Sequence, residues 1–218
     1  MAINLNLTQQ DYDELLDCID SENIVLLPVI INKFNISPLH QLLDSPRIGF
    51  RDQVIYTYID YILSYNLTNV LDYFIDDLSL EITDGIIARS LELNTDTYEY
   101  LMRIGYTPGI ETFKIAVHNC MSGIVESILA IDDELVEQLH DEDIEYLFSF
   151  DMDEETVETI QVLFNNNISP HLFTRFLKAL KDPEDKYFGV GDEETDIAIE
   201  IIELLESYPL TDQDLKNP

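Results

Sequence analysis

Residues 97–108 read TYEYLMRIGYTP. The first part, Thr97 to Leu101, places large apolar side chains at helical spacing around a single acid. The second part contains Gly105, a residue suited to the left-handed exit of a helix, and then Thr107-Pro108, a pair suited to the next helix start. The stretch therefore predicts that one short helix ends here and that another begins a few residues later.

The phrase at Thr97–Leu101 returns along the chain. In each copy an apolar residue is followed by a polar or acidic one and then by large apolar residues. Counted on its second residue, which is Leu71, Tyr98, Val125, Ile160 or Ile202, the five copies follow at intervals of 27, 27, 35 and 42 residues. Self-similarity at tens of residues is typical of stacked repeats, in which each unit buries its apolar face against its neighbours. The sequence thus predicts a repeat array.

Apolar residues at helical spacing, broken by short polar segments, predict pairs of helices of about ten residues each. The predicted pairs are 54–62 with 70–75, 86–91 with 98–102, 113–120 with 125–129, 144–148 with 157–164, and 173–180 with 197–205. No stretch alternates with a period of two for long, so little or no β-structure is expected. We predict an all-α solenoid of five to seven stacked helix-turn-helix units.

The predicted organisation has three parts. An N-terminal helical capping region spans residues 1–50 and holds helices near 12–19, 24–34 and 38–44. The repeats span 51–209, with an insertion at 181–192, and a tail spans 210–218. The insertion accounts for the long last interval between copies of the phrase.

The residues at the starts and ends of the predicted helices resemble those of a known repeat family. Ser37-Pro38-Leu39-His40 resembles the Thr-Pro-Leu-His that starts the first helix of an ankyrin unit, and Asn35-Ile36-Ser37-Pro38 recurs as Asn167-Ile168-Ser169-Pro170. The interval from Pro38 to Pro108 is 70 residues and that from Pro108 to Pro170 is 62 residues. Each interval is close to two ankyrin units of about 33 residues. Over roughly residues 50–208 the chain resembles divergent ankyrin repeat proteins of the kind that giant DNA viruses carry. The intervals of 27 leave little room for the β-hairpin finger of that family, and another α-solenoid is the alternative.

The charge of the chain limits its partners. There are 44 acids against 11 Lys and Arg, a formal charge of −33. Such a field repels nucleic-acid phosphates and anionic lipid and favours a basic protein partner. Between Lys114 and Arg175 there are 14 acids and no Lys or Arg. We predict that partner-binding acids lie in this interval, at Asp132, Asp133, Glu134, Asp141, Glu142 and Asp143, the alternative being a solvated face with acids at helix starts.

Motifs for catalysis or metal binding are incomplete. The four histidines have no metal-ligand spacing, and His118 with Cys120 offers only two of the four ligands that zinc needs. The acids at 151–155 resemble the start of a calcium loop but lack its later glycine and glutamate, and fit a helix N-terminus better. Gly189-Val190-Gly191 lacks the Lys-Ser/Thr of a phosphate loop. We expect no enzyme activity, no cofactor and no metal.

Compartment and function follow from these features as expectations. Cys18 and Cys120 are the only cysteines, residues 1–16 do not resemble a signal peptide, and the longest apolar run, 24–31, is short of the roughly 20 residues that span a bilayer. A cytoplasmic protein without a membrane anchor is predicted, in the host cytoplasm if viral, or a nuclear one. The main functional hypothesis is a protein-interaction adaptor. The alternative is an acidic mimic of nucleic acid that blocks a basic nucleic-acid-binding protein.

Overall fold

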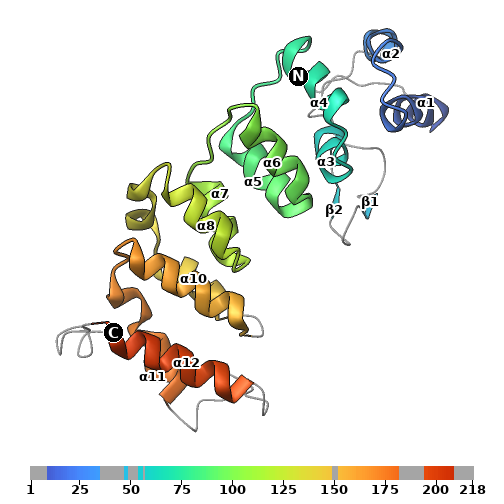
Figure 1. The fold of residues 1–218 in the computed structure, drawn as a ribbon. Helices are drawn as coiled ribbons and strands as arrows, with labels where there is room; N and C mark the ends of the chain where they lie inside the picture. Colours follow the sequence, from blue (N-terminus) through green and yellow to red (C-terminus); the bar gives the residue numbers. More distant parts are fainter. Residues whose placement is uncertain are drawn as a thin grey trace. The chain divides into compact units, whose positions relative to one another are not determined.

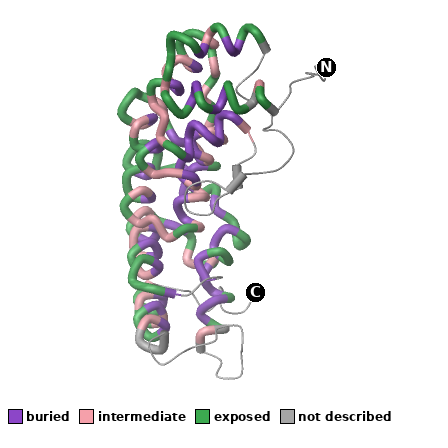
Figure 2. The backbone as a smooth tube through the Cα atoms, turned by 90° about the vertical axis from the view of Figure 1, so that its right-hand side faces the viewer, coloured by how far each residue is buried: buried purple, intermediate pink, exposed green. Residues whose placement is uncertain are grey.

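A computed structural model describes residues 9–34, 47–48, 54–55, 57–148, 152–181 and 194–208. These residues are mainly helical (Figure 1). The chain divides into two compact units, Met1–Pro108 and Gly109–Pro218, here called the N-terminal and C-terminal units. Most helices of each unit carry both buried and exposed positions, as amphipathic helices do (Figure 2), whereas residues 58–64 are buried throughout.

The N-terminal unit is a set of helix pairs with one short antiparallel ladder. Its helices are α1 (Gln9–Asp20), α2 (Leu27–Phe34), α3 (Tyr58–Ser64), α4 (Thr68–Asp76), α5 (Asp84–Leu93) and α6 (Thr95–Arg103). In the ladder, β1 (Arg47–Ile48) pairs with β2 (Val54–Ile55). Consecutive helices pack in pairs, α1 on α2, α3 on α4 and α5 on α6, and α3 also contacts α5.

The C-terminal unit continues the same order of short helices. Its elements are α7 (Ile110–His118), α8 (Ser122–Leu129), the 3-10 helix η2 (Asp133–Gln138), α9 (Asp141–Leu147), α10 (Glu154–Asn165), the 3-10 helix η3 (Pro170–Phe173), α11 (Thr174–Lys181) and α12 (Glu194–Ser207). Helix α7 packs on α8 and on α9, α8 packs on α10, and α10 packs on α12, which also contacts α11. First helices thus contact first helices, and second helices contact second helices.

The repeated phrase falls inside a helix at all five places. Its second residue lies in α4, α6, α8, α10 and α12. In the first four of these helices that residue is at most 5% exposed. In α12 the buried position belongs to Ile201 instead, and Ile202 is half-buried. The phrase therefore marks the buried side of α4, α6, α8 and α10, and in α12 the buried position is one residue earlier.

One backbone turn joins the two helices of three pairs. It centres on Glu22 after α1, Asn66 after α3 and Cys120 after α7, with left-handed φ values of 47°, 53° and 52°. In each turn the N–H of the following residue donates to the carbonyl five residues before it. These bonds run from Asn23 to Cys18 at 3.1 Å, from Leu67 to Ile62 at 3.1 Å, and from Met121 to Ala116 at 2.9 Å. This bond is the one that closes a Schellman helix end. Asn66 and Cys120 are 54 residues apart, twice the interval of 27.

The exits of two second helices share this geometry. Gly105 follows α6 with φ 105°, and Asn167 follows α10 with φ 64°. The following N–H groups, of Tyr106 and Ile168, bond carbonyls five residues back, each at 3.1 Å. The prediction that a helix ends at Gly105 is confirmed, and Asn167 ends α10 in the same way.

A methyl group at Gly105 or at Gly123 would meet no atom within 4 Å, yet substitution by alanine is expected to have opposite effects at the two positions. Gly105→Ala is expected to lower the free energy of unfolding by about 1–2 kcal/mol, because an L side chain is strained at φ 105°. Gly123→Ala is expected to raise it by about 0.5 kcal/mol, because Gly123 lies in helix α8 without a positive φ. Chemical denaturation of both variants checks the pair. Equal effects would contradict the assigned turn.

Some predicted boundaries were wrong. The helix expected from residue 54 begins at Tyr58. Thr57 has an extended backbone and caps this helix, because its side-chain hydroxyl accepts from the Asp60 N–H. Val54–Ile55 form strand β2 instead. The 3-10 helices η2 and η3 were not foreseen. Several predictions lie outside the described residues: the helix near 38–44 with its Ser-Pro-Leu-His, nearly all of the 181–192 insertion, and the 210–218 tail. No described helix is long and apolar enough to cross a membrane.

Candidate protein-interaction surface

The six acids predicted to bind a partner do not share one environment. Five of them are exposed: Asp132 caps η2, Asp133 and Glu134 lie in its first turn, and Asp141 and Glu142 begin α9. Asp143 is only 6% exposed. It is therefore removed from the predicted binding set, because its carboxylate faces helix α7 and not solvent.

Asp143 is the third residue of α9 and ties that helix to α7. Its carboxylate accepts from the backbone N–H of His140 at 2.9 Å, from Lys114 Nζ at 2.8 Å and lies 3.3 Å from His118 Nε2. Burial alone raises the pKa of Asp143, but the bonds from Lys114 and His140 outweigh burial and hold that pKa below its ordinary value. Asp143 is thus an internal, ionised partner of α7.

His118 belongs to the same internal cluster. Its ring stacks on Tyr146 with 4.4 Å between ring centroids, and its side chain is 19% exposed. Burial, helped by the charge of Lys114, lowers the pKa of His118 in spite of the opposing effect of Asp143. His118 of α7 therefore packs against α9.

The N-terminal unit holds a matching cluster. Asp60, 7% exposed, is the third residue of α3, where it accepts from the Thr57 N–H at 3.0 Å. Arg89 of α5 donates to Asp60 through Nε at 3.2 Å and to Glu92 through Nη1 at 2.8 Å. Each unit thus anchors one first helix to another through a buried aspartate at its start.

Sequence reasoning missed both aspartate clusters, although a signal was present. Thr57 and Asp60, like His140 and Asp143, have the three-residue spacing of a capping box. Lys114 and His118 lie four residues apart, on one face of a helix. Together these two spacings would have predicted that Lys114 and His118 of one helix contact the capping aspartate of another.

His118 predicts a pH-dependent contribution to stability. Because its folded pKa lies below the unfolded value of 6.5, the unfolded chain binds the proton more tightly. The contribution of neutral His118 to the free energy of unfolding is fully present above the unfolded pKa of this histidine. It is lost as pH falls through the folded pKa. Wild type is therefore expected to lose stability relative to His118→Gln between about pH 7.5 and about pH 5. Urea denaturation measures this difference. A difference that stays constant with pH would contradict it.

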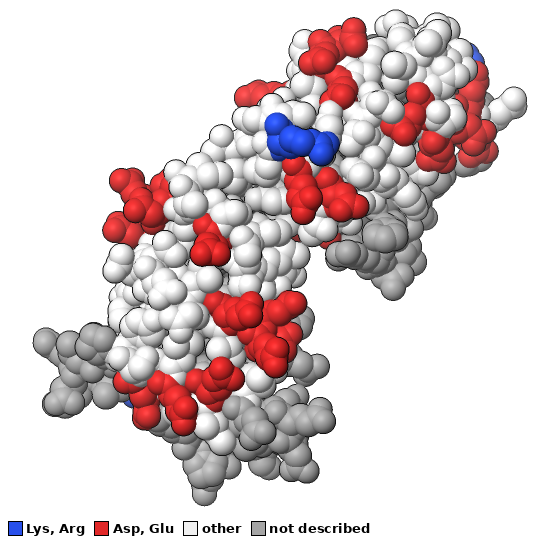
Figure 3. Space-filling view, viewed as in Figure 1, with Lys and Arg blue, Asp and Glu red and all other residues white. Residues whose placement is uncertain are grey.

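A second set of acids lies on the second helices of the C-terminal unit. These acids are exposed, and we call them the second-helix acidic face: Glu126 of α8, Glu154, Glu155 and Glu158 of α10, and Glu200, Glu203 and Glu206 of α12. Helices α8, α10 and α12 contain no Lys or Arg. Figure 3 shows Asp and Glu side chains grouped over the part of this unit that holds α10 and α12.

Local helix chemistry accounts for Glu154 and Glu155, which lie in the first turn of α10, but not for the acids of α8 and α12. Glu203 and Glu206 lie toward the C-terminus of α12, and Glu126 lies in the last turn of α8, where the helix dipole disfavours an acid. Glu200, Glu203 and Glu206 are also spaced three apart, so neighbouring like charges repel. In contrast Asp132, Asp141 and Glu142 stand at helix starts, where acids are stabilising.

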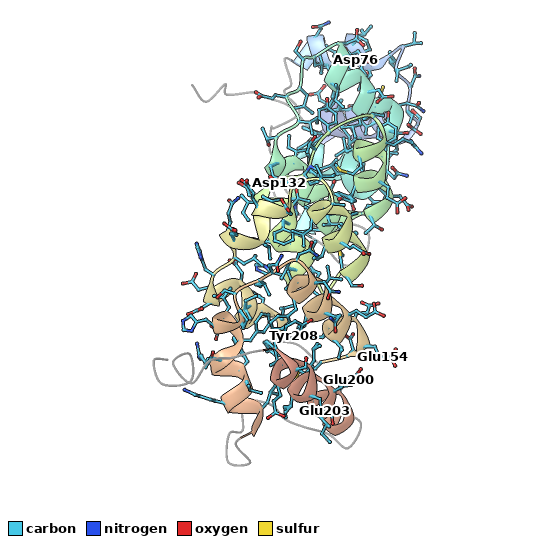
Figure 4. The ribbon with its side chains drawn as sticks, turned by 60° about the vertical axis from the view of Figure 1, so that its left-hand side comes forward. Asp76, Asp132, Glu154, Glu200, Glu203 and Tyr208 are labelled. Carbon is cyan, nitrogen blue, oxygen red and sulfur yellow. The ribbon has the colours of Figure 1, made fainter. Side chains whose placement is uncertain are left out.

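Asp132 lies apart from the second-helix acidic face. Figure 4 places Asp132 at one edge of the C-terminal unit and Glu154 at the opposite edge, with Glu200 and Glu203 on α12. The face itself is held by contacts between the helices: Ser122 Oγ of α8 donates to Glu158 of α10 at 3.0 Å, and Gln161 of α10 donates to the hydroxyl of Tyr208, just after α12, at 2.9 Å. A partner could engage one group without the other.

The described residues contain no group of three His, Cys, Asp or Glu side chains placed to hold a metal ion. Cys18 and Cys120 are free, and burial raises the pKa of each thiol. Asp153 caps α10, as the helix-start interpretation of residues 151–155 predicted. No protein-family model, no curated protein and no solved structure matches this chain.

Proposed function

We propose that this protein is a non-enzymatic interaction module that binds a basic protein partner on its second-helix acidic face. One observation carries the proposal: seven exposed glutamates lie on three successive second helices that have no Lys or Arg. Acids placed against the helix dipole and beside like charges lower stability. A basic partner would offset that cost.

The scaffold in this proposal is an ankyrin-like α-solenoid. The support is the order of packing, first helix on first and second on second, together with the shared turn at Glu22, Asn66 and Cys120. Pro170 starts η3, and Pro108 stands two residues before α7, in keeping with the family's helix starts. A stack of this kind presents a long surface of regularly spaced helices, which suits binding to another protein.

Electrostatic attraction would act mainly on the association rate. Oppositely charged surfaces steer encounter, and the effect falls as salt shortens the Debye length to about 8 Å at physiological ionic strength. The proposed partner is cytoplasmic or nuclear, in host cells if the protein is viral. It is basic at its binding surface, as a complement to the glutamates of α8, α10 and α12.

Two variants with equal charge change test the proposed surface. The face variant carries Glu155→Gln, Glu158→Gln, Glu200→Gln and Glu203→Gln. The segment variant carries Asp132→Asn, Asp133→Asn, Asp141→Asn and Glu142→Gln, so each loses four negative charges. In affinity capture from the native cell, wild type and the segment variant are expected to retain the same basic protein, and the face variant is expected to lose it.

Other outcomes of the capture would overturn the proposal. Loss of the partner from the segment variant alone would place binding at residues 132–142. Release of the partner by duplex DNA, with equal loss in both variants, would favour nucleic-acid mimicry. Turnover of a small molecule by the purified chain, without an enriched protein, would favour an enzyme.

A further inference from the structure

We propose that the start of α2 is a second docking surface, which takes an amphipathic helical segment of a partner with an apolar face and a basic edge. The surface, here called the apolar strip, consists of Ile24, Val25, Leu26 and Val29. It lies in the N-terminal unit and depends on contacts separate from the second-helix acidic face. Its success or failure is therefore distinguishable from that of the function proposed above.

Exposure sets the apolar strip apart from the rest of the described surface. Nine large apolar side chains are exposed in the described residues, and four of them lie within the six positions 24–29. Val25 at 83% and Val29 at 61% are the most exposed of the nine. Isolated exposed apolar residues are ordinary, whereas a contiguous group marks an interaction site.

The backbone places the most exposed members on one side. The Leu27 N–H bonds the Asn23 carbonyl at 3.0 Å and the Ile30 N–H bonds the Leu26 carbonyl at 3.2 Å, so the turn before α2 runs into the helix without a break. Val25 and Val29 are thus one helical turn apart. The core-facing residues of the helix are different ones, Leu27, Ile30 and Ile31, at most 5% exposed. The strip is an additional apolar surface, separate from the core-facing side.

Acids flank the apolar strip. Residues 9–34 contain six acids and one base, Lys33. Lys33 near the end of α2 pairs with Glu14 in the middle of α1 at 3.1 Å, and the short turn at 21–26 joins the end of α1 to the start of α2, so the two packed helices run antiparallel. One turn back along α2 and one turn forward along α1 from this pair bring Val29 and Asp17 to the same level. Asp17 and Asp20, both exposed, form an acidic row on the neighbouring helix, and Asp20 also accepts from the Tyr61 hydroxyl at 2.6 Å.

Charge complementarity selects the occupant. A second copy of the chain would bring another formal charge of −33 and the same acidic row, so pairing strip to strip is opposed. An anionic membrane surface is repelled for the same reason. An amphipathic helix with apolar side chains at i, i+3, i+4 and i+7 can cover Val25 and Val29 while its Lys or Arg residues meet Asp17 and Asp20.

The test uses a synthetic helical peptide of about eighteen residues, or five turns, with leucines on one face and lysines elsewhere. A scrambled peptide of the same composition controls for charge. The protein variant is Val25→Ser with Val29→Ser, and Ile131→Ser, 60% exposed in the C-terminal unit, is the matched control. The amphipathic peptide is expected to bind the double variant at least about tenfold more weakly than wild type or Ile131→Ser. The scrambled peptide is expected to make no such distinction.

Several results would overturn this inference. Equal peptide affinity in wild type and the double variant would do so, as would loss of affinity in the face variant alone. Self-association of wild type that the double variant abolishes would make a second copy the occupant. Protection of residues 24–29 from hydrogen exchange by another segment of the free chain would leave no open surface. Circular dichroism of each variant checks that the exposed substitutions leave the helices intact.

Discussion

Replacing Asp143 with alanine is expected to lower the free energy of unfolding of the C-terminal unit by about 3 kcal/mol. The substitution leaves the ammonium group of Lys114 without its carboxylate and removes the cap on the His140 N–H. Because the folded pKa of Asp143 lies below 3.8, this contribution is present above that value and is lost as pH falls through the folded pKa. Urea denaturation at neutral pH and under acidic conditions measures both effects.

Two variants serve as controls for Asp143→Ala. Asp141→Ala removes an exposed acid two positions earlier in the same helix and is expected to cost at most about 1 kcal/mol. Asp60→Ala removes the matching buried aspartate of the N-terminal unit and is expected to cost about as much as Asp143→Ala. If Asp143→Ala costs no more than Asp141→Ala, the tie between α7 and α9 contributes nothing beyond the helix start.

Replacing Phe173 with alanine is expected to cost about 3–5 kcal/mol. Phe173 is 0% exposed and lies at the centre of an aromatic cluster, 5.0 Å from the ring of Phe164 and 6.4 Å from that of Phe148. A cavity there would separate η3 and α11 from α9 and α10. Phe173→Leu, which keeps most of the volume, is expected to cost less than about 2 kcal/mol.

The location of the damage is as informative as its size. In a stack of repeats each unit contacts only its neighbours, so instability should stay local. Hydrogen exchange is expected to show faster opening of η3 and of helices α9 to α12 in Phe173→Ala, with unchanged protection of α3 to α6 in the N-terminal unit. Equal acceleration in both units would show that the chain opens as a single cooperative block.

The helices were largely predictable from sequence because their ends carry strong local signals. Asn66, Gly105 and Asn167 take left-handed conformations, and Asp153 caps a helix, all as the residue types indicate. Strand β2 was missed because Val54 also fits the helical spacing of Tyr58 and Ile62. The pairing with β1 overrides this spacing, and strands of two residues are too short to show an alternating pattern.

The candidate surface was only partly predictable for a related reason. Counting acids located the exposed residues Asp132 and Glu142 but could not distinguish them from Asp143, whose burial depends on Lys114 in another helix. The second-helix acidic face was missed because its glutamates are spread over three helices and form no dense run in the sequence. Only the packing of α8, α10 and α12 brings them onto one side.

The association rate of the captured basic partner is the most direct test of the central claim. It is measured for wild type, the face variant and the segment variant, at low and at high ionic strength. At low ionic strength the face variant is expected to associate about tenfold more slowly than wild type, with the segment variant close to wild type. At high ionic strength the three rates should converge. Equal slowing of both variants would show that only net charge matters and would contradict a specific binding face.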